Sequence, residues 1–209
     1  MALSKCMGYQ NKMGLISNGT TLLDAGALDS GVPTGSMTLL STATANNSST
    51  ITFNSGINST YKEYIVKWIN VHPNTNDQQL TVNFRDGSTA YDATKTSSAF
   101  RVGHAEDGSA TEIGYQTGQD LAQGTGAQSI HYTANQNEAS SSGMLHLFDP
   151  SSTTFIKHYI IVNSSDRNGQ CEQQYIAGYC NVTAAIDGIQ LATNENTIQT
   201  GTFKLYGIK

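Results

Sequence analysis

Apolar and polar residues alternate with a period of two in several short stretches of this chain, beginning at Met37. In residues 80–84, LTVNF, the side chains of Leu80, Val82 and Phe84 fall on one side of an extended backbone. Successive side chains of a β-strand point to opposite faces, so this period is typical of a strand with one buried face. The pattern therefore predicts β-strands rather than amphipathic helices.

The strongest strand signal lies in residues 61–71, YKEYIVKWINV, followed by Pro73. Apolar side chains occupy both faces near its middle, which predicts a central strand covered on both sides. Proline cannot donate a ladder hydrogen bond and is expected to end this strand. Further strand signals, separated by turn residues, follow in 143–149, 155–165, 173–183, 187–193 and 201–209. Short strands at intervals of about 8–12 residues predict an all-β, jelly-roll-like β-sandwich.

The chain divides into two predicted parts. Residues 1–36 are rich in glycine and irregular, which indicates either an arm that packs on something else or a loosely docked first strand. Residues 37–209 carry the β-sandwich, with a long irregular excursion at about 87–142. Short apolar pairs in the arm are the predicted attachment residues: Leu15, Ile16, Leu22 and Leu23.

The composition departs from that of an ordinary soluble domain. Only 13% of the residues are charged, against about 25% on average. Ser, Thr, Asn and Gly fill the difference, while 10 Tyr, 6 Phe and 1 Trp provide aromatic side chains for a core. Disordered sequences are poor in aromatic and β-branched residues, so this chain does not belong with them. Neutral polar surfaces suit a protein that works outside cells or packs against many neighbours.

Charge and hydropathy argue against two classes of partner. The net charge is −5 and the 11 basic residues are scattered, whereas nucleic-acid binding relies on clustered Lys and Arg. No stretch is long and apolar enough to span a bilayer, and residues 1–20 lack the continuous apolar region of a secretory signal. We therefore expect no nucleic-acid partner and no membrane insertion. Synthesis in a cytoplasm, with release by lysis inside an assembled particle, fits these observations.

The cysteines and histidines form no recognisable site. Cys6, Cys171 and Cys180 fit neither a disulfide framework nor a C-x-x-C motif. Either all three are reduced thiols, or Cys171 and Cys180 pair from neighbouring strands. His146 and His158 lie across a predicted hairpin and are expected to be cross-strand neighbours, but no third metal ligand can be named. No nucleophile elbow or phosphate-binding loop is present. We predict no catalytic residue, no metal and no cofactor.

Carbohydrate binding is the alternative function that the residues support. Aromatic rings beside polar groups form platforms for ligands, and loops carry many binding residues. The candidate ligand contacts are Tyr91, Tyr115 and Tyr132, in the irregular region. Trp68 lies in the strongest strand, so core packing is its expected role.

An ordered series of segments gives the chain a resemblance to a protein family. The series comprises STITFNSGINSTYKEYIVKWINVHPNTNDQQLTVNF (49–84), SGMLHLFDPSSTTFIKHYII (142–161), QYIAGYCNVTAAIDGIQL (174–191) and IQTGTFKLYGIK (198–209). In these segments the chain resembles virion structural proteins of tailed bacteriophages, especially marine ones.

The resemblance implies a β-sandwich that serves as a particle component, on the head as a decoration or fibre, or on the tail. The implied partners are copies of the same chain, with a trimer favoured, and other virion proteins such as the major capsid or a tail protein. We therefore expect a non-enzymatic virion component made in the cytoplasm of a bacterial host. The alternative is a receptor-binding module that recognises carbohydrate on the host surface. The resemblance carries over no catalytic residue.

Overall fold

The computed structural model describes residues 15–17, 20–24, 27–28, 36–136 and 138–209. The chain separates into two compact units, Met1–Ser36 and Met37–Lys209. In the first unit three short strands form an antiparallel sheet, namely β1 (Leu15–Ser17), β2 (Thr20–Asp24) and β3 (Ala27–Leu28). The predicted attachment residues lie on β1 and β2, but their side chains fall outside what the structure describes: Leu15, Ile16, Leu22 and Leu23.

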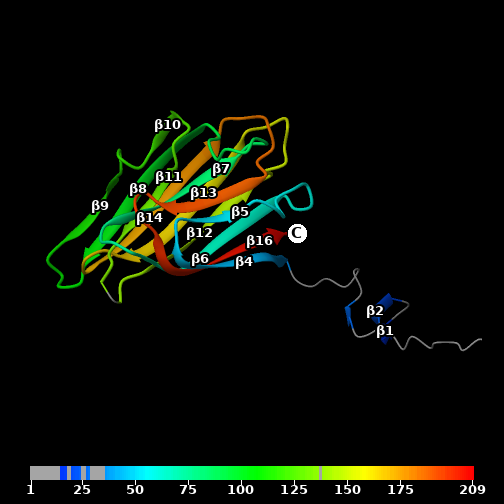
Figure 1. The fold of residues 1–209 in the computed structure, drawn as a ribbon, viewed down its shortest axis with the longest axis horizontal. Coiled ribbons are helices and arrows are strands. Elements are labelled where there is room, and N and C mark those ends of the chain that lie inside the picture. The colour runs from blue at the N-terminus through cyan, green and yellow to red at the C-terminus, as the bar shows by residue number, and fades with distance from the viewer. Residues whose placement is uncertain (1–14, 18–19, 25–26, 29–35, 137) are drawn as a thin grey trace, which may run out of the picture. The chain divides into compact units, whose positions relative to one another are not determined.

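Within the described part of the second unit, thirteen strands form two antiparallel sheets that pack against each other, which confirms the predicted all-β sandwich (Figure 1). The larger sheet has the order β10-β8-β14-β13-β12-β6-β16-β4, with β9 paired to β8, and the smaller sheet has the order β11-β7-β15-β5. The strands are β4 (Met37–Ser48), β5 (Thr50–Phe53), β6 (Glu63–Pro73), β7 (Gln78–Arg85), β8 (Lys95–Ala105), β9 (Thr111–Tyr115), β10 (Leu121–Gly124), β11 (Gln128–Thr133), β12 (Ser141–Phe148), β13 (Lys157–Asp166), β14 (Gln170–Cys180), β15 (Gly188–Thr193) and β16 (Ile198–Ile208).

Eight of these strands follow the order of a jelly roll. In chain order they are β4, β5, β6, β7, β11, β12, β15 and β16. The first pairs with the last, the second with the seventh, the third with the sixth and the fourth with the fifth. This nested antiparallel pairing results when one long hairpin is rolled around a core. We call these eight strands the roll.

The other five strands extend the larger sheet beyond β12. The hairpin β13–β14 is inserted in the chain between β12 and β15, and β8, β9 and β10 are inserted between β7 and β11. They continue the sheet in the order β13-β14-β8, with β9 and β10 each paired to β8. We call these five strands the extension. Figure 1 shows β8 and β9 on the side of the sheet opposite β4 and β16.

Strands of both regions correct the prediction of an irregular excursion at 87–142. That segment contains four complete strands, β8 to β11, and the first residues of β12. β8, the longest of them, shows no alternation of apolar and polar residues that would predict a strand, because the side chains that it turns inward are polar or small. They are Lys95, Ser97, Ala99, Arg101 and Gly103.

The apolar core lies between the two sheets and draws on both the roll and the extension. Tyr64, Trp68 and Phe203 are buried there in one cluster. Trp68 takes its expected core position, and its Nε1 donates a hydrogen bond to Asn163 Oδ1 at 2.7 Å, the kind of partner that a buried indole requires. β6 is central in the larger sheet, as predicted. On its outward face Ile65 is buried, but Ile69 is 42% exposed, so the strand is covered on both faces over only part of its length.

Candidate functional site on the outer face of the larger sheet

The outer face of the larger sheet, which points away from the smaller sheet, carries most of the exposed apolar side chains. Among the described residues, nine of the ten exposed large hydrophobic side chains lie on this face. The tenth is Phe155, in the loop between β12 and β13. We call the nine the outer-face patch: Met37, Leu39, Ile69, Phe100, Val102, Ile113, Tyr115, Met144 and Ile160.

The residues of the outer-face patch are spread over six strands of the larger sheet, β4, β6, β8, β9, β12 and β13. Polar side chains lie between them, among them the register partners Lys67 and Lys204. All nine nevertheless share one face of one sheet, which makes this face a candidate interaction surface.

Within the extension, β8 and β9 reverse the polarity expected of strands with one face in water. Along β8 the inward side chains include Lys95 and Arg101, whereas Phe100 and Val102 point outward and are exposed. On β9 the outward Ile113 is 77% exposed. Strands with one solvated face normally direct polar residues to water and apolar residues to the core. The reversal places apolar side chains on a face that the described chain itself does not cover.

Three aromatic side chains form a row across β14, β8 and β9 on this face. In the sheet register Tyr175 is opposite Phe100, and Phe100 is opposite Tyr115. The rings of Tyr175 and Phe100 stack with centroids 4.8 Å apart and an interplanar angle of 14°. The hydroxyl of Tyr115 donates to Asp120 Oδ2 at 2.7 Å, and this hydrogen bond raises the pKa of Tyr115. The aromatic row is thus held both by stacking and by a polar contact at its end.

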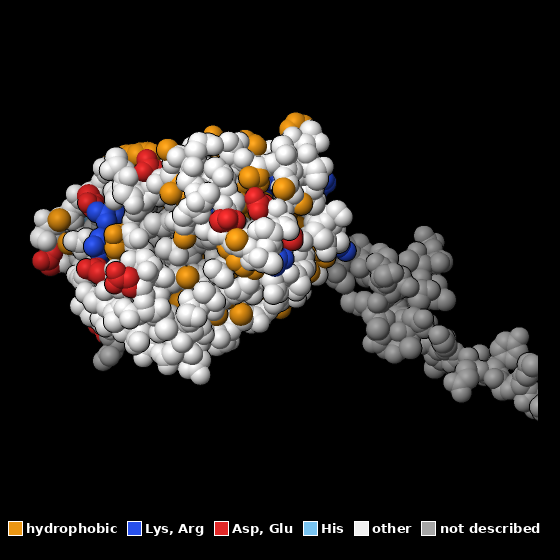
Figure 2. All heavy atoms as spheres, turned by 45° about the horizontal axis from the view of Figure 1, so that its top comes forward, with side chains coloured by type: hydrophobic (Ala, Val, Ile, Leu, Met, Phe, Trp, Pro, Cys, Tyr) orange, Lys and Arg blue, Asp and Glu red, His pale blue; other side chains and the backbone are white. Residues whose placement is uncertain are grey.

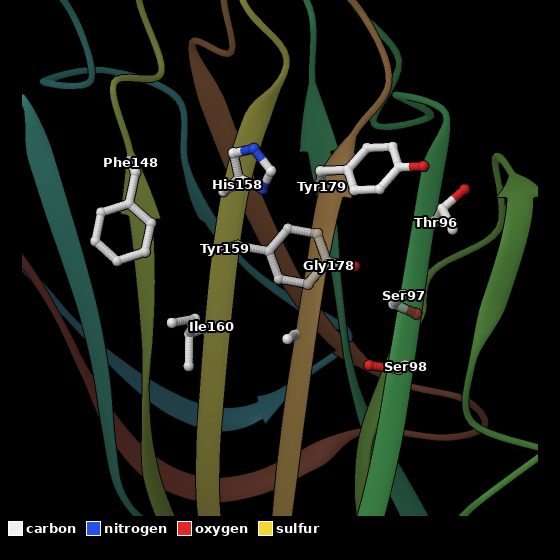
Figure 3. A pocket seen from close by; sticks show the side chains of 10 residues that line it. Thr96, Ser97, Ser98, Phe148, His158, Tyr159, Ile160, Gly178 and Tyr179 are labelled. Atoms are coloured by element: carbon white, nitrogen blue, oxygen red, sulfur yellow. The ribbon is translucent and has the colours of Figure 1, made fainter.

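A trough of about 540 Å³ opens on the outer face over β12, β13, β14 and β8 (Figure 3). The small side chains of Ser98 and Ala177 leave space between larger neighbours. Two of these, His158 and Tyr179, meet edge to face with ring centroids 5.9 Å apart. Ile160 lines the trough and also belongs to the outer-face patch. The volume lies in the range of about 300–1,000 Å³ that binding pockets occupy.

Charged side chains contribute little to the exposed surface. Figure 2 shows one face on which neutral side chains and backbone cover most of the area, with Lys, Arg, Asp and Glu in small groups. Such a surface offers few ionic anchors to a partner. Contacts made by this protein are therefore expected to depend on apolar and neutral polar groups.

The inward side of the extension holds a buried charged cluster. Glu172 on β14 lies 3.2 Å from His131 Nε2, 3.3 Å from Arg101 Nη1 and 4.0 Å from Arg167 Nη1. Burial acts to raise the pKa of Glu172, but the contact with His131 and the positive charges of Arg101 and Arg167 outweigh it and lower the pKa. A carboxylate held in the anionic form is a poor general acid. The cluster instead joins β8, β11 and β14.

A second buried row at the other end of the extension contains Lys157, Cys180 and Lys95, which are register partners on β13, β14 and β8. Lys157 Nζ donates to two carbonyl oxygens in the loop after β14, at 2.9 and 2.5 Å. Lys95 Nζ donates to Ala93 O at 2.6 Å and to Asn83 Oδ1 at 2.5 Å. Burial lowers the pKa of Lys95 to about 8 and raises the pKa of Cys180 to about 12. The thiol is therefore protonated near neutral pH and is a poor nucleophile.

The structure distributes the predicted ligand tyrosines over three elements. Tyr115 is in the aromatic row. Tyr91 lies in the loop between β7 and β8, with the guanidinium of Arg85 5.7 Å from its ring centroid. Tyr132 lies on β11, with the guanidinium of Arg167 at 4.5 Å. The sequence did not indicate Tyr175 and Phe100, the other members of the aromatic row. β14 and β8 are far apart in the chain, and their pairing register leaves no local pattern.

The sheet register also settles two predicted pairs. His146 is opposite Ile160, so His146 and His158 are not direct cross-strand partners. Cys171 and Cys180 lie on the same strand. At about 3.3 Å per residue they are roughly 30 Å apart, far beyond the reach of a disulfide. Within the described ranges, no three His, Cys, Asp or Glu side chains gather as metal ligands.

In the part of the chain that the structure describes, no helix has the length and apolar character needed to cross a membrane. Comparison with protein-family models, with curated proteins and with solved structures finds no match to this chain. The basis for a functional proposal is therefore the chemistry and geometry of the outer face.

Proposed function

We propose that this chain is a non-enzymatic structural component of a tailed-phage virion, carried on the head as a decoration or fibre, or on the tail. Its jelly-roll unit assembles with copies of itself through the outer-face patch. The observation that carries this proposal is the reversed polarity of β8 and β9, which turns Phe100, Val102 and Ile113 outward. The resemblance of the four sequence segments to phage virion proteins supports the choice of particle.

Burial of the exposed apolar side chains of the outer-face patch would favour assembly, and the costs of association offset much of that gain. Homo-oligomers normally close with cyclic symmetry, and a trimer is the expected form. The fold alone does not decide the function, because jelly rolls occur in capsid proteins, lectins and cupins.

The first experiment locates the protein in purified particles by cryo-electron microscopy, with a label at Lys209. Density repeated over the icosahedral shell would make the chain a decoration or head-fibre protein. Density on the tail would make it a tail component. Particles that contain none of it would overturn the virion proposal.

The second experiment measures the mass of the free chain in solution by light scattering. Phe100→Asp places a charge in the outer-face patch and is expected to reduce the assembly to monomers. Thr50→Asp is the matched control, because Thr50 is an exposed residue of β5 in the smaller sheet. Equal masses for both variants and the parent would contradict assembly through the patch.

A second candidate function, recognition of host-surface carbohydrate, is favoured by the aromatic row. Stacked rings next to hydroxyl and carboxylate groups can pack against the apolar face of a sugar. Signal on a glycan array that disappears with Tyr115→Ala but persists with Tyr91→Ala would favour this function. No signal from the parent chain on any glycan would count against it.

A further inference from the structure

Phe155 stands apart from the other exposed hydrophobic side chains. It is 71% exposed and lies in the β12–β13 loop, outside the outer-face patch. A single exposed ring needs no explanation by itself. Two features of its surroundings bear on the role of this ring. Hydrogen bonds order the loop that carries it, and the trough lies on the neighbouring strands.

The β12–β13 loop holds Phe155 in a defined position. Ser152 Oγ accepts hydrogen bonds from the backbone N–H groups of Phe155 at 3.0 Å and Thr154 at 3.3 Å. The carbonyl of Pro150 accepts a hydrogen bond from the N–H of Ile186 at 2.8 Å, which ties the loop to the segment before β15. A side chain on a pre-ordered loop loses less conformational entropy on binding. The loop therefore presents the ring as a knob.

The trough suits a phenyl ring in both size and chemistry. Its volume of about 540 Å³ exceeds that of one aromatic side chain. The side chains of Phe148, Ile160 and Ala177 provide an apolar lining, and His158 and Tyr179 add ring faces and edges. Aromatic groups prefer such offset or edge-to-face contacts. Figure 3 shows the labelled side chains Phe148, His158, Ile160 and Tyr179 on three neighbouring strands.

The loop that carries Phe155 and the trough both lie at the end of β12 and the start of β13. The loop that carries Phe155 leaves β12 at Phe148 and enters β13 just before His158, and both of these residues line the trough. Phe155 is nevertheless exposed in its own chain. A knob and a trough on one chain form a contact that closes a ring of copies, or a reciprocal pair where both lie beside a two-fold axis.

We propose that Phe155 of one copy seats in the trough of a second copy. This inference rests on the self-assembly in the proposed function and names the contact that specifies it. The ring alone is too small for a stable interface, which needs about 800 Å² per partner. Ile160 is shared by the trough and the outer-face patch, so a seated ring brings the neighbouring copy onto that patch.

The test measures self-association of the full chain by sedimentation velocity over a concentration series. Phe155→Ser removes the knob, and Ala177→Trp fills the trough. Each is expected to weaken association at least ~10-fold, because each removes the apolar contact area of one buried ring. Thr154→Ala is the matched control in the same loop and is expected to leave association unchanged. Unchanged far-ultraviolet circular dichroism verifies that the variants fold.

Mixing the two variants distinguishes the specific contact of Phe155 with the trough from non-specific association. A Phe155→Ser copy keeps an intact trough, and an Ala177→Trp copy keeps an intact knob, so one productive contact forms between unlike copies. Native mass spectrometry of the mixture is expected to show hetero-oligomers in excess of either homo-oligomer. A statistical mixture, or none at all, would overturn the knob-and-trough contact.

The remaining outcomes distinguish the inference from the proposed function. If Phe100→Asp abolishes association while Phe155→Ser does not, the outer-face patch assembles the protein and the knob inference fails. If the parent chain is a monomer at every concentration, the knob contact and the proposed self-assembly are both wrong. Whether the protein is part of the particle is then decided by the cryo-electron microscopy experiment alone. If Phe155→Ser keeps association but loses incorporation into particles, the knob binds another virion protein and the proposed second copy is wrong.

Discussion

The roll and the extension differ in what they bury on the inner face of one continuous sheet. The extension adds buried charged groups to buried apolar side chains such as Tyr159, Ile161 and Ile176. In the roll the inner face carries Trp68 and Phe203, which are packed in the apolar cluster. In the extension the inner face carries Lys95, Lys157 and Glu172, all buried. The outer faces of both regions carry exposed apolar side chains, and the most exposed of these lie on β9. The extension thus combines buried charge with part of the apolar surface through which we propose that copies assemble.

The difference follows from what each region packs against. Side chains of two facing sheets fill the roll interior, where apolar packing gives the largest gain. In the extension, polar groups of β11 face β13 and β14, as in the hydrogen bond from Tyr159 to Gln128 Oε1 at 3.0 Å. Each buried polar group there needs a partner. Such networks specify strand register more than they add stability.

Removing a large apolar side chain from the roll should have the largest effect. Phe203→Ala deletes a fully buried ring on β16 and leaves a cavity, so the free energy of unfolding should fall by about 3–5 kcal/mol. Urea denaturation followed by tryptophan fluorescence measures this change, since the reporter Trp68 lies in the same cluster. A loss below about 1 kcal/mol would show that this part of the roll is loosely packed.

Breaking the charged cluster of the extension should have the next largest effect. Glu172→Gln removes the anion that faces His131, Arg101 and Arg167, and should cost about 2–4 kcal/mol because positive charges remain partly buried. The pKa of Glu172 is lowered in the folded chain, so its stabilisation is complete above the unfolded pKa near 4.5 and is lost as pH falls through the folded value. Thermal unfolding between pH 6 and pH 3 should therefore show a steeper decline for the parent than for Glu172→Gln.

Replacing Lys95 should change how stability depends on alkaline pH. The folded pKa of Lys95 is about 8, below the unfolded value of about 10.4. Between these values the unfolded chain binds more protons, so the contribution of Lys95 to stability rises with pH, by on the order of 2 kcal/mol. Cys180 acts in the opposite direction, because its pKa is raised. Burial is the largest cause of that rise and the charge of Lys95 opposes it, so most of the Cys180 contribution is present in both the parent and Lys95→Met.

The stability difference between the parent and Lys95→Met should accordingly grow in favour of the parent from pH 7 to pH 10. Guanidinium denaturation at both pH values measures it. Lys62→Met is the matched control, since the Lys62 side chain is 79% exposed. A difference that stays constant with pH would mean that Lys95 is charged throughout this range.

How much the sequence could predict differs between the two regions for a physical reason. Alternation at Leu80, Val82 and Phe84 predicted β7 because its buried face is apolar. The inward side chains of β8 are polar or small, so its pattern predicts no strand. The trough and the aromatic row depend on the pairing of strands distant in the chain, and single-sequence patterns do not encode register. The all-β sandwich was therefore predictable as a class of fold, whereas Tyr115 was the one residue of the aromatic row that the sequence suggested.

The smallest effect on folding is expected for a substitution on the exposed face of β9. Ile113 on β9 is 77% exposed, so Ile113→Ser should change the free energy of unfolding of the free chain by no more than about 0.5 kcal/mol. The same substitution removes apolar area from the outer-face patch and should weaken self-association measurably in sedimentation velocity. Two matched measurements on one variant thus separate folding from assembly. A destabilised but fully associating variant would mean that β9 belongs to the folding core of the extension, and that its outward apolar surface has no partner.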